Sequence, residues 1–447
     1  MKFFIKTYGC QMNVRDTEAV RSLLQRHGHV AVASEDEADL VVVNTCSVRG
    51  KAEDKALGKL SLLVAGRRER PARIVGVIGC MAQRMGAGLL KRVPGLDFAV
   101  GTHRIASLPS VINLVREGRG PYADVAEEDA DLDLLQGHAD GAASAFVNIL
   151  LGCDRFCAYC VVPHVRGRER SRPAADILAE IRALAARGVR EVTLLGQSVM
   201  SYGRANAVWP DTHVSPMGLR EPLPRLLEAA SAIEGLARIR FTTGHPSGCT
   251  EELARAMAGL PAVCEHLHLP LQSGSDRILQ RMRRGYSTDG YRHAAGRLRK
   301  AVPGLALTTD LIVGFPGETP EDFEATRQFC GEMEFDNAFI FKYSPRPNTP
   351  AAEWDDTVTA EEKLRRNKVL LADQDRQSLT LHAGLVGRVV EVLVEGVSLR
   401  NPHRWSGRTR TNKIVIFERA AAMNAGMLAR VRIERVMAQT LYGTVAA

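Results

Sequence analysis

Three cysteines in the middle of the chain lie close together in the pattern Cys-x3-Cys-x2-Cys. They are Cys153, Cys157 and Cys160. Three thiolates on one tight loop can hold three irons of a cubane [4Fe–4S] cluster, which leaves the fourth iron free to bind a substrate. A zinc ion with His164 as an extra ligand is the alternative. We favour the cluster, because the loop follows the first strand of a predicted barrel, where that fold carries its chemistry.

Three further cysteines are distributed over the N-terminal part of the chain. Cys10, Cys46 and Cys80 each follow a strand-like segment. The carboxyl ends of parallel strands lie along one edge of a sheet, where open α/β folds bind ligands. We therefore expect these thiols to converge on a second metal site, with three separate buried thiols as the alternative. The other three cysteines are predicted to be core residues: Cys249, Cys264 and Cys330.

The segments around these cysteines alternate between strand-like and helix-like patterns. Strands are predicted over residues 3–8, 40–44 and 74–78, and helices over 16–27 and 52–64. This pattern is typical of an α/β unit with a parallel sheet. Residues 121–140 contain acidic residues but no Lys or Arg, and they follow a Gly-Pro breaker. We assign an N-terminal α/β domain to residues 1–117 and an acidic linker to residues 118–138.

Residues 144–345 repeat the strand-then-helix pattern six times. Six units are too few for a closed eight-stranded barrel, so a partial (βα)6 barrel is predicted, within a domain spanning residues 139–377. Its site is expected at the carboxyl ends of the strands. The polar residues predicted to line that site are Gln197, Ser198, Gln272, Ser273 and Asp310, together with Gly314. Each of them is equally compatible with a turn-forming or capping role.

The pattern after a helical stretch at residues 360–380 becomes alternating and β-like, which predicts a small C-terminal β-barrel over residues 378–442. From residue 385 onward, basic residues outnumber acidic ones by more than two to one. Such a surface suits a phosphate-rich partner, and a plain solvated surface is the alternative. The candidate RNA contacts are Arg408, Arg410, Lys413, Arg430 and Arg432.

The composition excludes several protein classes. Of the 447 residues, 25% are charged and 45% are hydrophobic, as in folded globular proteins, and the net charge is +8. No apolar run approaches the ~20 residues that a membrane span requires. The start of the chain lacks the pattern of a signal peptide. We therefore expect a cytoplasmic protein without disulfides, with a monomer as the default state.

The cysteine loop after the first strand of a partial barrel resembles that of the radical S-adenosylmethionine enzymes. Residues 1 to about 442 are similar to one family among them, the methylthiotransferases, which combine a three-cysteine α/β domain, this barrel and a β-module. Residues 7–13 (TYGCQMN) and 44–49 (NTCSVR) resemble the branch that acts on N6-dimethylallyladenosine in tRNA. The ribosomal-protein branch typically has Pro and Lys after the first cysteine, and the threonylcarbamoyladenosine branch has Lys and Val.

Further stretches carry the same resemblance. Residues 406–409, with Asn412 and Lys413, match the RNA-binding module called TRAM. The other matching stretches are 159–163, 166–173, 268–275 and 314–319. Four positions depart from the usual family pattern. The family usually has Asn where this chain has Ser198 and Met200, Gly where it has Asn348, and Glu where it has Gly50.

The resemblance implies two [4Fe–4S] clusters and S-adenosylmethionine as cofactors. One cluster would be bound by Cys153, Cys157 and Cys160 and would chelate the cofactor, and the other would be bound by Cys10, Cys46 and Cys80. It also implies a radical reaction that adds a methylthio group to C2 of an adenine next to the anticodon. The partners would be tRNA, an electron donor and a sulfur source.

Two alternatives to this function stay open on the sequence alone. The first is a methylthiotransferase that acts on threonylcarbamoyladenosine in tRNA or on a ribosomal protein. The second is a metal-stabilised RNA-binding protein without enzymatic turnover.

Overall fold

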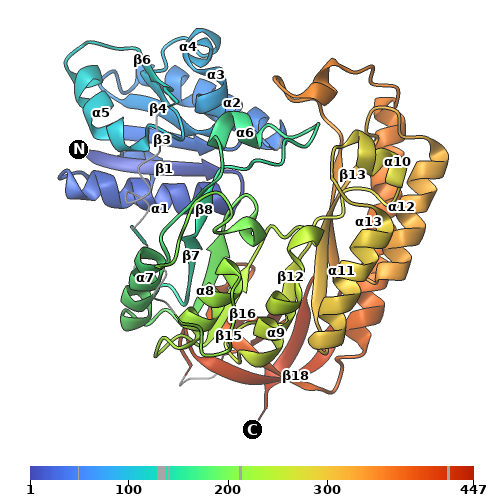
Figure 1. Cartoon of the computed structure of the whole chain (residues 1–447). Coiled ribbons are helices and arrows are strands. Elements are labelled where there is room, and N and C mark those ends of the chain that lie inside the picture. Colours follow the sequence, from blue (N-terminus) through green and yellow to red (C-terminus); the bar gives the residue numbers. More distant parts are fainter. Residues whose placement is uncertain (49, 128–136, 139–140, 211–213, 420–422, 447) are drawn as a thin grey trace.

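The computed structural model describes residues 1–48, 50–127, 137–138, 141–210, 214–419 and 423–446. Its N-terminal part is a parallel sheet in the order β2-β1-β3-β4-β5-β6, drawn in blue and cyan in Figure 1. This confirms the predicted parallel α/β fold. The strands are β1 (Lys2–Tyr8), β2 (Val30–Ala31), β3 (Leu40–Thr45), β4 (Ile74–Gly79), β5 (Phe98–Val100) and β6 (Tyr122–Asp124).

Helices cover both faces of this sheet. β3 and β4 are buried along their whole length, which explains why they read as continuous apolar runs rather than as alternating patterns. One face packs against α1 (Gln11–Arg26) and α5 (Leu108–Arg116). The other packs against α2 (Gly50–Ala65), α3 (Cys80–Met85) and α4 (Ala87–Arg92).

The segment predicted as an acidic linker begins inside the sheet. β6 pairs in parallel with β5, and the Asp124 carboxylate accepts hydrogen bonds from Arg104 Nε at 2.9 Å and Ser107 Oγ at 2.5 Å. A strand of three residues is too short to show apolar periodicity, and its acidic residue is satisfied by partners that the local sequence does not reveal. The sheet therefore extends to Asp124. Residues 128–136 of the predicted linker lie outside the described residues.

The middle of the chain forms the predicted six parallel strands. They make two three-stranded sheets, which are joined by an isolated bridge between Ile239 and Val263. Among the described strands, β7 and β14 are the two edges, so the barrel is open. The strands are β7 (Ser144–Asn148), β10 (Glu191–Leu195), β11 (Arg238–Phe241), β12 (His266–His268), β13 (Ala306–Val313) and β14 (Asn337–Lys342).

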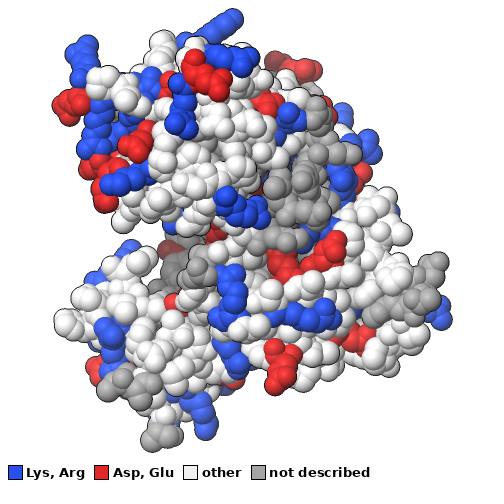
Figure 2. Space-filling view, turned by 90° about the vertical axis from the view of Figure 1, so that its left-hand side faces the viewer, with Lys and Arg blue, Asp and Glu red and all other residues white. Residues whose placement is uncertain are grey.

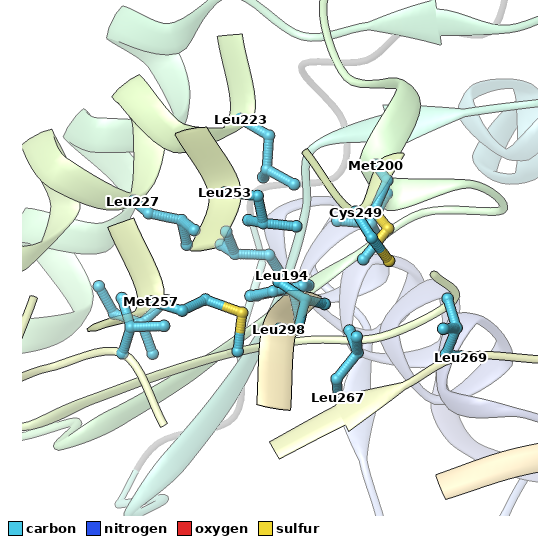
Figure 3. Close-up of a cluster of buried hydrophobic side chains, with 14 of the residues drawn as sticks. Leu194, Met200, Leu223, Leu227, Cys249, Leu253, Met257, Leu267, Leu269 and Leu298 are labelled. Carbon is cyan, nitrogen blue, oxygen red and sulfur yellow. The ribbon is translucent and has the colours of Figure 1, made fainter. Parts of the chain in front are cut away.

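The outer face of the barrel packs against helices to form the main core, part of which Figure 3 shows. Leu194 and Leu267 belong to this core. Because successive side chains of a strand point to opposite faces, Leu195 and His268 point to the interior of the barrel. The helices are α7 (Ala174–Ala186), α8 (Pro222–Ser231), α9 (Glu251–Gly259), α11 (Thr288–Ala301), α12 (Pro320–Met333) and α13 (Ala360–Ala383).

The C-terminal part is a closed barrel in the order β15-β16-β17-β19-β18, which confirms the predicted small β-barrel. Its interior is apolar and includes Trp405, Phe417 and Val431. The strands are β15 (Val389–Ser398), β16 (Asn401–Thr409), β17 (Ile414–Glu418), β18 (Leu428–Val436) and β19 (Leu441–Val445).

The β16–β17 hairpin docks against the amino ends of the central strands. Arg238 Nη1 donates to the Arg408 carbonyl at 2.7 Å. Arg240 donates to the carbonyls of Thr409 at 2.7 Å and Arg410 at 2.6 Å, and its Nε lies 2.9 Å from Glu191 Oε1. Both arginines are buried. The C-terminal barrel is thus attached to the end of the central barrel that is opposite to the cysteine loop.

Replacing Arg240 by Met is expected to loosen this attachment, because two backbone carbonyls and Glu191 lose a buried charged donor. Removing one partner of a buried ion pair costs about 3–5 kcal/mol. Calorimetry should therefore show the C-terminal barrel unfolding at a lower temperature than in the parent chain. Arg432→Met is the control, because this exposed guanidinium donates to the Gly387 carbonyl at 3.0 Å and should change stability by about 0.5 kcal/mol or less. Equal effects of the two substitutions would contradict the docking role.

Candidate functional site

The three N-terminal cysteines lie at one edge of the first sheet. Cys10 follows β1, Cys46 follows β3, and Cys80 follows β4 as the first residue of α3. β1, β3 and β4 are neighbours and parallel, so their carboxyl ends lie side by side. Cys10 Sγ donates to Asn13 Oδ1 at 3.4 Å, and Cys46 is near enough to lower the pKa of Cys10. The structure thus brings the predicted residues to the same edge.

Each N-terminal thiol has a different electrostatic environment. Hydrogen bonding from Cys46 holds the pKa of Cys10 below its usual range, and the same bond with burial raises the pKa of Cys46. Burial also raises the pKa of Cys80, while Arg166 opposes that shift. Cys46 Sγ accepts from the Val48 N–H at 3.2 Å. Cys80 Sγ accepts from Arg166 Nε at 3.3 Å.

Two asparagines hold the backbone around Cys10 and Cys46. The Asn13 Nδ2 donates to Asn44 Oδ1 at 3.1 Å, and Asn44 Nδ2 donates to the Asn13 carbonyl at 2.9 Å. Gly9 is required here, because a Cβ at this position would lie 2.2 Å from Asn13 Oδ1 and its φ is +152°. The asparagines therefore fix the two cysteine-bearing loops to each other.

The second cysteine triad lies on the loop after β8 (Leu150–Leu151). The loop begins at Gly152, where φ is +76° and a Cβ would lie 2.0 Å from the Arg168 carbonyl. The Cys153 N–H donates to the Gly167 carbonyl at 3.2 Å, and the Cys160 N–H donates to the Cys157 carbonyl at 3.0 Å. The first bond ties the start of the loop to Gly167, directly after α6 (Val162–Arg166), and the second closes a turn from Cys157 to Cys160.

Burial dominates the electrostatics of this loop. It raises the pKa of Cys153, and burial together with the neighbouring Cys157 raises the pKa of Cys160 to about 12. The buried Arg284 donates from Nη1 to Cys157 Sγ at 3.3 Å. Thiols in such surroundings are poor free nucleophiles, since the thiolate is the reactive form. They are suited to a metal centre that supplies the positive charge for deprotonation.

The donor sets of both triads suit an iron–sulfur cluster in their chemistry. Each consists of three cysteine thiols, and thiolates are the soft ligands that such clusters favour. A structural zinc ion would need a fourth ligand. His164, the zinc alternative, is exposed on α6 (Val162–Arg166).

Two of the predicted pocket residues lie after β10, and the structure brings one of them to the cysteine loop. Ser198 Oγ accepts from Arg155 Nε at 3.4 Å, and Arg155 belongs to that loop. Gln197 Oε1 is a buried oxygen that has no hydrogen-bond partner among the described residues.

The other predicted pocket residues lie on the opposite sheet of the barrel. Gln272 has a φ of +73°, and its backbone continues the pairing with β13 through bonds to Asp310 and Ile312 of 2.8 and 2.9 Å. The Asp310 carboxylate lies on the inner face, 3.3 Å from His268 Nε2. Ser273 is buried and bonds Thr326 Oγ1 at 3.3 Å, so its role is structural.

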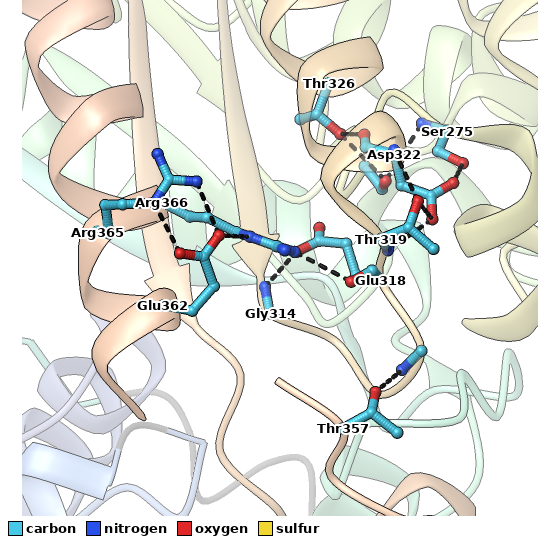
Figure 4. Close-up of polar contacts among 12 residues, drawn as sticks. Ser275, Gly314, Glu318, Thr319, Asp322, Thr326, Thr357, Glu362, Arg365 and Arg366 are labelled. Atoms are coloured by element: carbon cyan, nitrogen blue, oxygen red, sulfur yellow. Dashed lines mark hydrogen bonds and ion pairs between the residues drawn. The ribbon is translucent and has the colours of Figure 1, made fainter. Parts of the chain in front are cut away.

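The end of β13 is fixed by a polar network that Figure 4 shows. The Gly314 N–H donates to Glu318 Oε2 at 2.5 Å, and Arg366 Nη1 donates to the same oxygen at 2.6 Å. Arg366 also bonds Glu362 at 2.7 Å. Gly314 thus shapes the rim of the site through its backbone.

The two triads are brought together by direct packing between the domains. Cys80 packs against Val161 and Val165, which follow Cys160 in the chain. Figure 1 shows α6 against the N-terminal domain. On the other side, Met12 and the partly buried Cys10 pack with Leu195 at the end of β10. The N-terminal triad therefore faces the mouth of the barrel.

The predicted RNA contacts fall into two groups. Arg410 pairs with Glu265 at 2.7 Å and Lys413 with Asp336 at 2.5 Å, both across the contact with the central barrel. Arg408 pairs with Glu395 within the C-terminal barrel at 3.1 Å. Arg430 and Arg432 are exposed on β18. On the face that Figure 2 shows, Lys and Arg side chains stand among Asp and Glu side chains rather than in one continuous basic patch.

Three family models match the chain. The model described as Radical SAM superfamily matches residues 147–330, Uncharacterized protein family UPF0004 matches residues 2–101, and TRAM domain matches residues 384–446. Curated tRNA-2-methylthio-N(6)-dimethylallyladenosine synthases of Akkermansia muciniphila and Moorella thermoacetica are each 44% identical to this chain. The alignments cover 99% of this chain and 98% and 97% of those proteins. This chain belongs to the family of tRNA-2-methylthio-N(6)-dimethylallyladenosine synthases.

Solved structures of other proteins share the fold. The radical S-adenosylmethionine methyltransferase TsrM from Kitasatospora setae, solved with its tryptophan substrate and a SAM analog, matches with a TM-score of 0.58. The match covers 78% of this chain and 75% of that chain at 15% identity. The cobalamin-dependent radical enzyme OxsB matches with a TM-score of 0.50, over 82% of this chain and 56% of that chain at 13% identity.

The structure accommodates two of the departures from the usual synthase pattern. Asn348, where Gly is more usual, has a φ of +66°, and Asn tolerates this left-handed conformation better than most residues. Met200, where Asn is more usual, is buried, and its Sδ accepts from the His245 N–H at 3.2 Å. Sequence reasoning missed Arg166 and Arg284, although both lie in or near matching stretches, because their sulfur partners are distant in the chain.

Replacing Cys157 by Ala is expected to remove the cluster of the barrel loop and to leave the N-terminal one, because the two triads share no ligand. Reconstituted protein should fall from about eight irons per chain to about four, with matching acid-labile sulfide. Cys80→Ala should give the same loss at the other triad. Cys330→Ala is the control, since this buried thiol lies in α12 outside both triads. If Cys157→Ala leaves the iron content unchanged, the assignment of Cys157 as a cluster ligand is wrong.

Proposed function

We propose that this chain is a radical S-adenosylmethionine enzyme that adds a methylthio group to C2 of N6-dimethylallyladenosine, next to the anticodon in tRNA. The observation that carries this proposal is the 43–44% identity, over at least 98% of this chain, to four synthases of that name. The facing cysteine triads support it, because such a reaction needs a radical source and a sulfur source within reach of one base.

The proposed cofactors are S-adenosylmethionine and two [4Fe–4S] clusters. Membership of the radical SAM superfamily implies one cluster and S-adenosylmethionine. The second cluster is proposed on Cys10, Cys46 and Cys80, whose thiols have the soft donor character that iron–sulfur clusters favour. When bound, the clusters would supply the one-electron chemistry and S-adenosylmethionine the methyl group, and the sulfur source would supply the transferred sulfur.

The chain's own residues hold and enclose these groups. Cys153, Cys157 and Cys160 would bind the cluster that faces S-adenosylmethionine, and Arg284 fixes Cys157 through its 3.3 Å contact. Gln197, Ser198, Gln272 and Asp310 are proposed to contact S-adenosylmethionine from the two sheets of the barrel. Gln197 Oε1, which has no partner in the part of the chain that the structure describes, would accept a hydrogen bond. Gln272 contributes the rigid backbone turn at the rim.

The proposed partners are tRNA, a reducing electron donor and a sulfur source. None of the described helices is both long and apolar enough to cross a bilayer. We propose a cytoplasmic location, which a tRNA substrate requires, and a monomeric state. The division into an N-terminal domain, a linker, a barrel domain and a C-terminal module is likewise proposed. The limits predicted at residues 117, 377 and 442 fall before β6, within α13 and within β19, so we place these boundaries after Asp124, Ala383 and Val445 and keep the limit at residue 138.

The decisive experiment is mass spectrometry of tRNA nucleosides from a cell with this gene and from a matched deletion strain. Deletion should remove the 2-methylthio derivative and leave N6-dimethylallyladenosine in its place, and the intact gene should reverse both changes. A complementing Cys157→Ala gene is the matched control and should not restore the modification. Loss of the methylthio group from threonylcarbamoyladenosine instead, or no change in any tRNA nucleoside, would refute the proposed substrate.

The C-terminal barrel is proposed to contact tRNA phosphates through Arg430 and Arg432, because both are exposed. Replacing both by Glu should weaken tRNA binding. It should also reduce the magnitude of the slope of log K against log salt concentration by about 1.4 to 1.8, as expected for two lost phosphate contacts. Filter binding over a salt series measures this slope. Arg410→Gln is the control, because Arg410 is paired with Glu265, and its slope should equal that of the parent. If Arg410→Gln reduces the slope as much as the double variant does, Arg410 also contacts phosphate and the proposed difference between paired and exposed arginines is wrong.

A further inference from the structure

A short helix links the two cysteine triads directly. α6 begins two residues after Cys160 and ends at Arg166. Val161 and Val165 pack against Cys80, and Arg166 is itself buried at 8% exposure. Arg166 therefore follows the cysteine loop of the barrel in the sequence, but its side chain lies at the N-terminal cysteines.

The Arg166 guanidinium is held in one orientation by a two-point ion pair. Its Nη2 lies 2.5 Å from Asp16 Oδ2, and its Nη1 lies 3.2 Å from Asp16 Oδ1. Asp16 is 1% exposed. Because a bidentate pair fixes the plane of the guanidinium, the remaining Nε–H is aimed at Cys80 Sγ at 3.3 Å.

The other triad has a comparable arrangement. Arg284, also 8% exposed, donates from Nη1 to Cys157 Sγ at 3.3 Å. Arg284 makes its other contacts with the Tyr286 hydroxyl, the Tyr159 hydroxyl and the Pro270 carbonyl. These partners are neutral, whereas Arg166 is paired with a carboxylate. The two arginines therefore place different net charges beside their sulfur atoms.

We propose that Arg166 is a positioning residue that sets the reduction potential of the group bound by Cys10, Cys46 and Cys80. This inference rests on the second cluster of the proposed function. Hydrogen bonds to the sulfurs and the local net charge are among the factors that set such potentials. The Nε–H of Arg166 stabilises negative charge on Cys80 Sγ and so favours the reduced form. Asp16 partly offsets the positive charge and keeps the donor in place.

The test uses the full-length chain with Cys153, Cys157 and Cys160 replaced by Ala, so that the reconstituted N-terminal cluster is observed alone. Two variants are made in this parent, Arg166→Lys and the double variant Asp16→Asn with Arg166→Met. The double variant avoids an unpaired buried charge. Iron and sulfide content and the midpoint potential, from a redox titration followed by electron paramagnetic resonance, are measured for each chain.

We expect the double variant to keep its iron and to show a midpoint potential more negative than that of the parent. Arg166→Lys keeps the charge but loses the fixed Nε–H donor, so its shift should be smaller and in the same direction. Arg284→Met is the matched control, because it removes a buried arginine that has no contact with Cys10, Cys46 or Cys80 and should leave this midpoint unchanged.

Three results would overturn the inference. The first is a double variant with full iron content and the midpoint of the parent. The second is loss of iron from both Arg166 variants, which would make the role of Arg166 purely structural. The third is an equal shift in Arg284→Met. A parent chain that binds no iron at Cys10, Cys46 and Cys80 would instead refute the proposed second cluster, and this inference would fall with it.

Discussion

The ends of parallel strands decide where the cysteine triads of this synthase family member lie. β1, β3 and β4 run side by side in one direction, so the residues that follow them meet at one edge. The same rule places the Cys153 loop at the carboxyl ends of the barrel strands. Backbone hydrogen bonds of the sheets fix these edges. The sheets therefore fix the points at which the cysteine-bearing segments begin.

The two sheet edges that carry the cysteine triads face each other. Buried arginine–carboxylate contacts across the domain boundaries help to hold the domains in this orientation. Arg166 pairs with Asp16, and Arg15 Nη2 lies 3.4 Å from Glu180 Oε1 of α7. Buried ion pairs are weak evidence for net stability, because desolvation opposes the Coulomb attraction. Breaking one is nevertheless costly, so these pairs penalise other relative orientations of the domains. Their contribution is to orientation more than to stability.

The parts of the site that the sequence predicted are those that depend on local pattern. Cys10, Cys46 and Cys80 were expected to converge because each ends an apolar strand-like run, and the alternation of strands and helices predicted both α/β units. Arg166 and Arg284 were not found, because their sulfur partners lie 86 and 127 residues away in the chain. No periodicity connects residues at such distances.

The basic residues of the C-terminal barrel show a further limit of reading function from composition. A guanidinium or ammonium group binds a carboxylate of its own chain as readily as a phosphate, and the sum of charges does not distinguish the two uses. Arg410 and Lys413 contact Glu265 and Asp336 of the central barrel, so part of the positive charge serves to join two domains. The charge that is available to a nucleic acid is what remains after such internal pairs are subtracted. In this chain the remaining positive charge includes that of Arg430 and Arg432 on β18. These two residues alternate with the buried Val431 and Ile433. One face of the strand therefore packs into the barrel, and the other presents its charges to solvent.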